Sequence, residues 1–290
     1  MISPAVFWPS ALGSAFFVAG CWLHRRELRF PAAIGPVFIA APLAAFAGEH
    51  FTAARSIAGL VPEWMPARLF IAYFVGVAEV AAALSLVGRR CTRWSTILLA
   101  MMFGMFVLLM DLPAAVENPA NRIYWILAVR QTTFAIGALA LFSIEIRHRW
   151  PTSSHGLAAV SRSWAGMAIL FYGSEHLLHP EGSPGVPSPK LTASWVPLPR
   201  LASYLTGILL VVFGAGMLVR NHARFAGTLA GLLMLLLTIV LYVPEFFLAS
   251  SDSESVVAIN FIFDTLLFSG TLLSVALAQR GFSTAAAEQR

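Results

Sequence analysis

The fold is decided by residues 64–89, WMPARLFIAYFVGVAEVAAALSLVGR, which return in altered form as residues 195–220, WVPLPRLASYLTGILLVVFGAGMLVR. The opening tryptophan and proline, the tyrosine and glycine of the apolar run and the closing arginine keep a constant offset. Upstream, Gly48-Glu49-His50 returns as Gly173-Ser174-Glu175-His176. Self-similarity over such a length indicates that an ancestral unit has been duplicated.

The composition predicts that this unit is folded in a membrane. Hydrophobic residues make up 58% of the chain and charged residues 11%, with a mean hydropathy of +0.77, which is far outside the soluble globular range. A helix crosses the hydrocarbon core with about 20 apolar residues. The runs that meet this requirement are Ile2–Leu23, Phe30–Ala47, Arg68–Val87, Ser95–Leu112, Ile123–Ile144, Leu157–Leu178, Leu201–Val219, Phe225–Leu248 and Val256–Ala278. We predict an all-α, polytopic membrane bundle of about nine transmembrane helices.

These runs divide into two parallel four-helix repeats and an extra N-terminal helix. Residues 1–29 hold the extra helix, 30–146 the first repeat and 157–279 the second, with a cytoplasmic linker at 147–156 and a cytoplasmic tail at 280–290. Each repeat begins with an inside-to-outside helix, so an axis along the membrane normal would relate them. Both Glu-His pairs would then lie at the same outer face.

The loop charges predict the orientation. Arginines gather in every second connection, which marks the cytoplasmic side: Arg25, Arg26, Arg29, Arg89, Arg90, Arg93, Arg147, Arg149, Arg220, Arg224, Arg280 and Arg290. We expect a bacterial inner-membrane protein with its N-terminus outside and its C-terminus in the cytoplasm. The net charge of +5 follows from these loops and gives no reason to expect a nucleic-acid partner. Cys21 and Cys91 form no CxxC motif, which argues against dithiol redox chemistry.

The outer ends of two predicted helices carry candidate site residues. Glu49 and His50 end the second span, and Glu175, His176 and His179 end the sixth. Imidazole and carboxylate groups can pass protons or hold a metal, and a minority hypothesis is a metal site made of the four duplicated residues. The alternative is a polar belt that caps each helix end separately. The residues leave open whether the two pairs converge.

Three further charges lie near the predicted midplane, namely Glu79, Arg130 and Asp264. A charge at this depth requires a partner or a polar cavity, and we expect Glu79 to pair with Arg130 across the third and fifth spans. The structural alternative is an ion pair that only fixes helix register. Leu210 stands at the second repeat's equivalent of Glu79, so the first repeat is the better candidate for chemistry.

Other features favour membrane anchoring and packing. Trp64 and Trp195 lie in proline-rich outer loops and are expected to anchor at headgroup depth. The segment Pro180–Pro189 is an insertion of the second repeat that could form a lid. Four methionines of the fourth span suggest copper ligands but are more typical of helix packing: Met101, Met102, Met105 and Met110.

The first repeat resembles the DoxX-like family of small four-helix membrane proteins. The matching segments are Ala47-Gly48-Glu49-His50-Phe51, Val61-Pro62-Glu63-Trp64-Met65-Pro66, Gly76-Val77-Ala78-Glu79 and Arg89-Arg90-Cys91-Thr92-Arg93. The second repeat is similar to the family more weakly. The resemblance implies several activities: a quinone-linked subunit of thiosulfate oxidation, redox-associated membrane proteins, and relatives that assist membrane-protein assembly.

We therefore expect a redox-associated or quinone-interacting subunit that works with another membrane or periplasmic protein. The sequence contains no CxxCH, no cysteine cluster and no glycine-rich dinucleotide fingerprint, so a partner would supply the electron carrier. The cofactor stays open, with a quinone as one candidate and a metal as the minority hypothesis. The alternative is a non-catalytic membrane scaffold or assembly factor, and a transporter is a weaker alternative. Whether the chain is an enzyme stays open.

Overall fold

The computed structural model describes residues 2–185, 192–193 and 195–279. The predicted tail at 280–290 and part of the insertion Pro180–Pro189 lie outside the described residues. Helices account for 82% of the structure, and the described residues contain no strand. The prediction of an all-helical fold is confirmed.

Within the described residues, nine long helices form the bundle: α1 (Pro4–Leu23), α2 (Gly35–Thr52), α4 (Arg68–Gly88), α5 (Thr92–Phe106), α7 (Arg122–Glu145), α8 (Pro151–Leu178), α9 (Pro199–Leu218), α10 (Ala223–Leu237) and α12 (Asp252–Ala278). The shorter elements are the 3₁₀-helices η1 (Glu27–Arg29) and η2 (Pro31–Ile34), the π-helices η3 (Val107–Asp111) and η4 (Thr238–Tyr242), and α3 (Ala54–Ala58), α6 (Leu112–Glu117) and α11 (Val243–Leu248). The segments α5–η3–α6 and α10–η4–α11 each form one continuous helix, with the π-helical turn in its interior.

Eight helices in the described part of the chain are long and apolar enough to cross a membrane, which makes this a multi-pass helical membrane protein. The predicted sixth span is not among these eight. It lies in α8, which begins at Pro151 and so takes up residues 151–156 of the predicted linker 147–156. The second helix is also displaced from its predicted run, because η2 occupies Pro31–Ile34 and α2 continues to Thr52.

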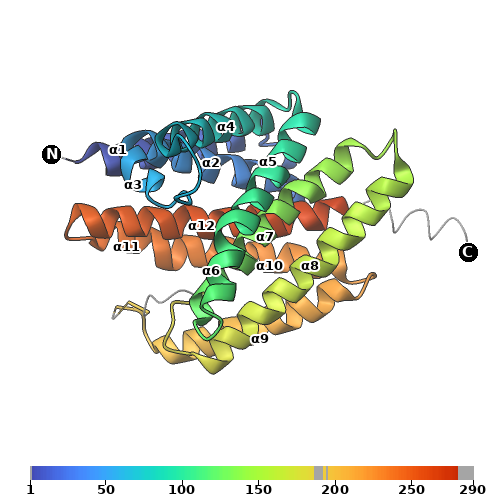
Figure 1. The fold of residues 1–290 in the computed structure, drawn as a ribbon. Helices are drawn as coiled ribbons and strands as arrows, with labels where there is room; N and C mark the ends of the chain where they lie inside the picture. The colour runs from blue at the N-terminus through green and yellow to red at the C-terminus, as the bar shows by residue number, and fades with distance from the viewer. Residues whose placement is uncertain (1, 186–191, 194, 280–290) are drawn as a thin grey trace, which may run out of the picture.

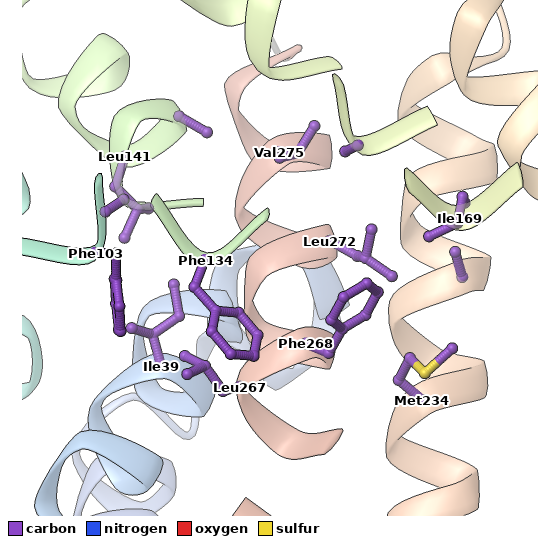
Figure 2. Close-up of a cluster of buried hydrophobic side chains, with 14 of the residues drawn as sticks. Ile39, Phe103, Phe134, Leu141, Ile169, Met234, Leu267, Phe268, Leu272 and Val275 are labelled. Atoms are coloured by element: carbon purple, nitrogen blue, oxygen red, sulfur yellow. The ribbon is translucent and has the colours of Figure 1, made fainter. Parts of the chain in front are cut away.

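The core is built around α12, which lies centrally in the bundle (Figure 1) and packs against α2, α7 and α10. Side chains of α12 pack with those of the surrounding helices in two apolar clusters, one of which is drawn in Figure 2. The ring of Phe268 lies 6.1 Å from that of Phe134 on α7 and 5.3 Å from that of Tyr172 on α8. Small residues allow the helix backbones to approach closely: a Cβ atom on Gly270 would lie only 2.6 Å from the backbone of Phe38 on α2.

Both π-helical segments lie directly before a proline near the start of the following helix, Pro113 in α6 and Pro244 in α11. A proline ring crowds the carbonyl group one turn earlier and provides no N–H for it. A locally widened turn is one way to relieve this conflict without ending the helix. The last residues of the two widened turns are Asp111 and Tyr242.

The arginine-rich connections contact one another. Arg89, after α4, forms an ion pair with Glu27 of η1, and His24 lies 2.9 Å from the carbonyl oxygen of Val87. The first residues of α1 and the last residues of α12 lie at opposite ends of the bundle (Figure 1). The helix α1 packs along α2 and also touches α12 and α4.

Candidate functional site

The site is organised around His50, two residues before the end of α2. Its Nδ1 lies 2.8 Å from the carbonyl oxygen of Ala72 on α4. This close packing requires Gly76, because a Cβ atom there would lie 2.8 Å from Cβ of His50. Since a carbonyl oxygen only accepts hydrogen bonds, Nδ1–H is the donor. In the neutral imidazole, Nε2 then presents a lone pair.

Glu79 lies behind His50. Its Oε2 is 3.9 Å from Nε2 of the imidazole, and the residue is 3% exposed. This oxygen forms no hydrogen bond with any described residue. A buried carboxyl oxygen without a donor is costly in a fold. Its place next to an imidazole therefore marks Glu79 as a candidate functional group.

A cavity of about 700 Å³ lies between α4 and α5, with His50 in its wall. The short helix α3 and the loop after it contribute Ile57, Leu60, Val61, Pro62 and Met65 to the lining. Most of the wall is apolar, and the polar side chains in it include Ser95, Asp111 and Gln131. The combination of a long apolar body with a few polar groups is typical of a site for an amphipathic ligand.

The cavity reaches the outer surface of the helix bundle. Phe74, Leu98, Met101 and Met105 line it and are 51–60% exposed. In a membrane protein, exposed apolar side chains on spanning helices face lipid. The cavity is therefore accessible from the hydrocarbon layer.

Arg130 pairs with Asp264 of α12, with Nη1 and Oδ2 2.5 Å apart. The expected pair between Glu79 and Arg130 is wrong, since no ion pair joins these two described residues. The physical reason is the packing: α12 lies directly against α7 and brings Asp264 to Arg130, whereas Glu79 lies on the face of α4 that contacts α2. Asp111 also lies close enough to Arg130 to interact with its charge.

Glu49 connects these groups. Its carboxyl group is close enough to Glu79 and to Asp264 for their charges to interact, and the side chain of Asn260 lies next to it. One oxygen of Glu49 is buried without a hydrogen-bond partner among the described residues. Five predicted residues thus form one polar cluster in the bundle, namely Glu49, His50, Glu79, Arg130 and Asp264.

The remaining candidates lie elsewhere. Glu175 pairs with Arg122 of α7 at 2.6 Å, and His179 lies 3.5 Å from Glu181 in a partly exposed pair. His176 is 1% exposed, with Nδ1 3.2 Å from the hydroxyl of Ser203 and Nε2 next to the backbone of Gly185. His50 and His176 are therefore held by separate partners, each within its own half of the chain. The Glu49-His50 and Glu175-His176 pairs do not converge.

The structure gives no support to a shared metal site. No group of three or more His, Cys, Asp or Glu side chains in the described part of the chain is arranged to hold a metal ion. The physical reason is that the ring nitrogens of His50 and His176 are directed to separate partners within their own halves. Trp64 and Trp195 are 70% and 39% exposed, and their anchoring at headgroup depth stays a prediction.

Sequence reasoning missed the cavity and two of its polar residues, Asp111 and Gln131. Asp111 lies within the predicted span Ser95–Leu112, but nothing in the sequence marks it as part of a site, and the structure places it at the end of η3. The methionine cluster had been assigned to packing, whereas Met101, Met102, Met105 and Met110 all line the cavity. A comparison of the two repeats would have given a signal, because leucines stand at the four corresponding positions of the second repeat: Leu232, Leu233, Leu236 and Leu241.

Comparison with protein families finds similarity to a domain of unknown function (DUF8561) over residues 39–141. This match covers about a third of the chain and runs from α2 to α7. It lies within the predicted first repeat. No curated protein and no solved structure matches the chain. The DoxX-like resemblance stays a prediction.

Proposed function

We propose that the chain consists of two parallel DoxX-like repeats preceded by an extra helix. Support comes from the element boundaries. The starts of α5 and α10 (92 and 223), of η3 and η4 (107 and 238) and of α6 and α11 (112 and 243) all differ by 131 residues. The left-handed residues before α4 and α9, Ala67 (φ 53°) and Leu198 (φ 49°), differ by the same number.

The packing pattern supports the same proposal. The helix α2 packs on α4 and on α12, and α8 packs correspondingly on α9 and on α7. Each half thus places its first helix against the last helix of the other. In this arrangement α8 is the ninth membrane helix. Its 28 residues give about 42 Å of helix, enough to cross a hydrocarbon core of about 30 Å. With nine crossings and the arginine-rich ends in the cytoplasm, the N-terminus is outside, in a bacterial inner membrane.

The first repeat binds a lipophilic quinol and its quinone, as a redox-associated subunit. The observation that carries this proposal is the cavity of about 700 Å³ with a mostly apolar, laterally accessible wall and His50 in its lining. An isoprenoid tail would occupy the apolar part between α4 and α5. The ring would lie at the polar residues, where His50 and Asp111 contribute to the wall.

The hydrogen-bonding state of His50 suits such a ring. Because Ala72 fixes the proton on Nδ1, the neutral Nε2 accepts a hydrogen bond from a quinol hydroxyl. Glu79, 3.9 Å from Nε2, is placed to exchange a proton with the imidazole, and Glu49 lies beyond it. The bound quinone would supply two-electron chemistry, and a membrane or periplasmic partner would supply the electron carrier.

Side-chain volume explains why the first repeat is the binding half. Ala78 and Ala81 line the cavity, and Leu209 and Val212 stand at the positions 131 residues later. The methionines of the first repeat are replaced by leucines in the second. Methionine is flexible and polarisable and adapts to ligands of irregular shape. Smaller residues on one helix and adaptable residues on the other leave room for a ligand.

The experiment uses the full-length protein in lipid nanodiscs with a decyl-benzoquinol as the probe. The double variant Ala78→Leu/Ala81→Val introduces the residues of the second repeat. We expect it to lower probe affinity about tenfold, which corresponds to about 1.4 kcal/mol. The control is Val77→Leu/Leu84→Val on the lipid-facing side of the same helix, where both residues are 58% exposed. The control should bind like the wild type.

Two results would decide against the proposal. One is the absence of saturable probe binding to the wild-type protein. The other is equal binding by the cavity variant and its control. If a membrane protein also copurifies in fixed proportion while no quinone is extracted from the purified complex, the scaffold or assembly role takes its place.

A further inference from the structure

In the second repeat, a short segment after α8 packs directly against the ring of His176. The backbone N–H and carbonyl oxygen of Gly185 lie 3.1 and 2.9 Å from Nε2 of His176. The hydroxyl of Tyr242 donates a hydrogen bond of 2.6 Å to the carbonyl oxygen of Pro184. Ser183, 2% exposed, contacts the same hydroxyl at 3.4 Å. We call residues 183–185 the plug.

His176 is the spatial counterpart of His50. A Cβ atom on Gly207 would lie 3.1 Å from Cβ of His176, just as one on Gly76 would lie 2.8 Å from Cβ of His50. The Nδ1 atoms also face matching positions, Ser203 in the second repeat and Ala72 in the first. Both the glycines and these partners differ by 131 residues.

The other contacts of the plug match the cavity wall of the first repeat. Tyr242 and Leu237, which lie 3.3 and 3.5 Å from a Cβ atom built on Gly185, correspond at the same offset to Asp111 and Phe106. Both of these residues line the cavity. The plug therefore lies where the first repeat has its cavity.

We infer that the second repeat is a latent copy of the ligand site, occupied by residues 183–185 of the chain itself. The plug presents an N–H donor and a carbonyl acceptor to one imidazole nitrogen. A quinol hydroxyl presents the same donor function to the lone pair on Nε2 of His50. The plug is thus a built-in substitute for the ring of the ligand, and this inference rests on the proposed function of the first repeat.

The chain explains why only the second repeat is plugged. His50 and Trp64 are separated by 14 positions, and His176 and Trp195 by 19, so the second repeat has five additional residues in this connection. Gly185 has a φ of +120°, which residues with a side chain rarely adopt. A side chain at this position would also press on Tyr242. The plug therefore depends on this glycine.

The experiment measures how many equivalents of decyl-benzoquinol bind to the full-length protein in nanodiscs. Gly185→Val should displace the plug. We expect one equivalent bound to the wild type and two at saturation to Gly185→Val, with the second lost when His176→Phe is added. The second equivalent should bind about tenfold more weakly, because Leu209 and Val212 narrow that half. The control is Gly156→Val, where a Cβ atom meets nothing within 4 Å, and it should bind one equivalent.

A thiol reporter follows the plug independently of binding. Ser183→Cys is introduced with Cys21→Ser and Cys91→Ser, and its labelling should rise about tenfold when Gly185→Val is added, because reactivity follows thiol exposure. The inference is overturned if this thiol stays protected, or if it becomes reactive while the number of bound equivalents does not increase. Failure of the wild-type protein to bind any probe counts instead against the proposed function of the first repeat.

Discussion

The surroundings of His50 and His176 differ in what fills the space beside the imidazole. Both residues are packed against a glycine of the next long helix, and both direct Nδ1 to the same position of that helix. Beside His50 there is a cavity, whereas beside His176 there is the backbone of Gly185. The difference teaches that one helical frame can hold an open or a closed site. Side-chain volume and five residues of loop determine which one forms.

The largest expected effect concerns Arg130 and Asp264, which join the last long helices of the two halves. Arg130→Leu or Asp264→Leu alone should lower the free energy of unfolding by about 3 kcal/mol, because a partly buried charge loses its partner. The double variant should lose less than either single variant. Reversible unfolding in mixed detergent micelles measures all three. Additive losses would mean that the pair does not contribute as a unit.

Substitution of the two histidines should separate binding from stability. His176→Phe leaves the buried N–H of Gly185 without an acceptor and should cost about 1–3 kcal/mol of unfolding free energy. It should leave the affinity for decyl-benzoquinol unchanged. His50→Phe should weaken that affinity about tenfold. The comparison between the two sites breaks down if both variants lose affinity equally.

A smaller contrast is expected at the ends of the two π-helices. Tyr242→Phe removes the donor to Pro184 and should lower the unfolding free energy by about 0.5–1.5 kcal/mol. Asp111→Asn should change stability less, because one oxygen of Asp111 is buried without a hydrogen-bond partner among the described residues. It should nonetheless weaken probe binding. Denaturation and binding titrations on the same preparations test whether the two effects separate in this way.

The smallest effect on stability is expected for two cysteine substitutions that report on which side of the membrane α8 and α12 begin. Ser153→Cys, at the start of α8, should be labelled only from the cytoplasm, and Ser253→Cys, at the start of α12, only from outside. Both positions are exposed. Impermeant maleimide on intact cells, in a background with Cys21→Ser and Cys91→Ser, gives the answer. Labelling of both from one side would show that α8 does not cross the membrane, and the repeats would then not be parallel.

The sequence by itself determined that the protein folds in a bilayer and that its fold is helical. Composition and long apolar runs are local properties, and within a bilayer only helices or closed barrels satisfy the backbone. The same reasoning located Glu49, His50, Glu79, Arg130 and Asp264 as unusual charges. It also predicted a span at Leu157–Leu178, whereas α8 is not among the eight described helices that are long and apolar enough to cross a membrane.

Only the tertiary structure decided which charges meet and which histidine has space beside it. Arg130 pairs with Asp264 because α12 packs against α7, and this contact joins residues 134 positions apart. Asp111 lines the cavity as the last residue of a π-helical turn inside a continuous helix. The cavity exists because small alanines of α4 face flexible methionines of α5. Whether this leaves a space depends on the distance between the two packed helices. Apolar content along the chain predicts that helices form, but the contacts between their faces are non-local and arise only when the bundle packs.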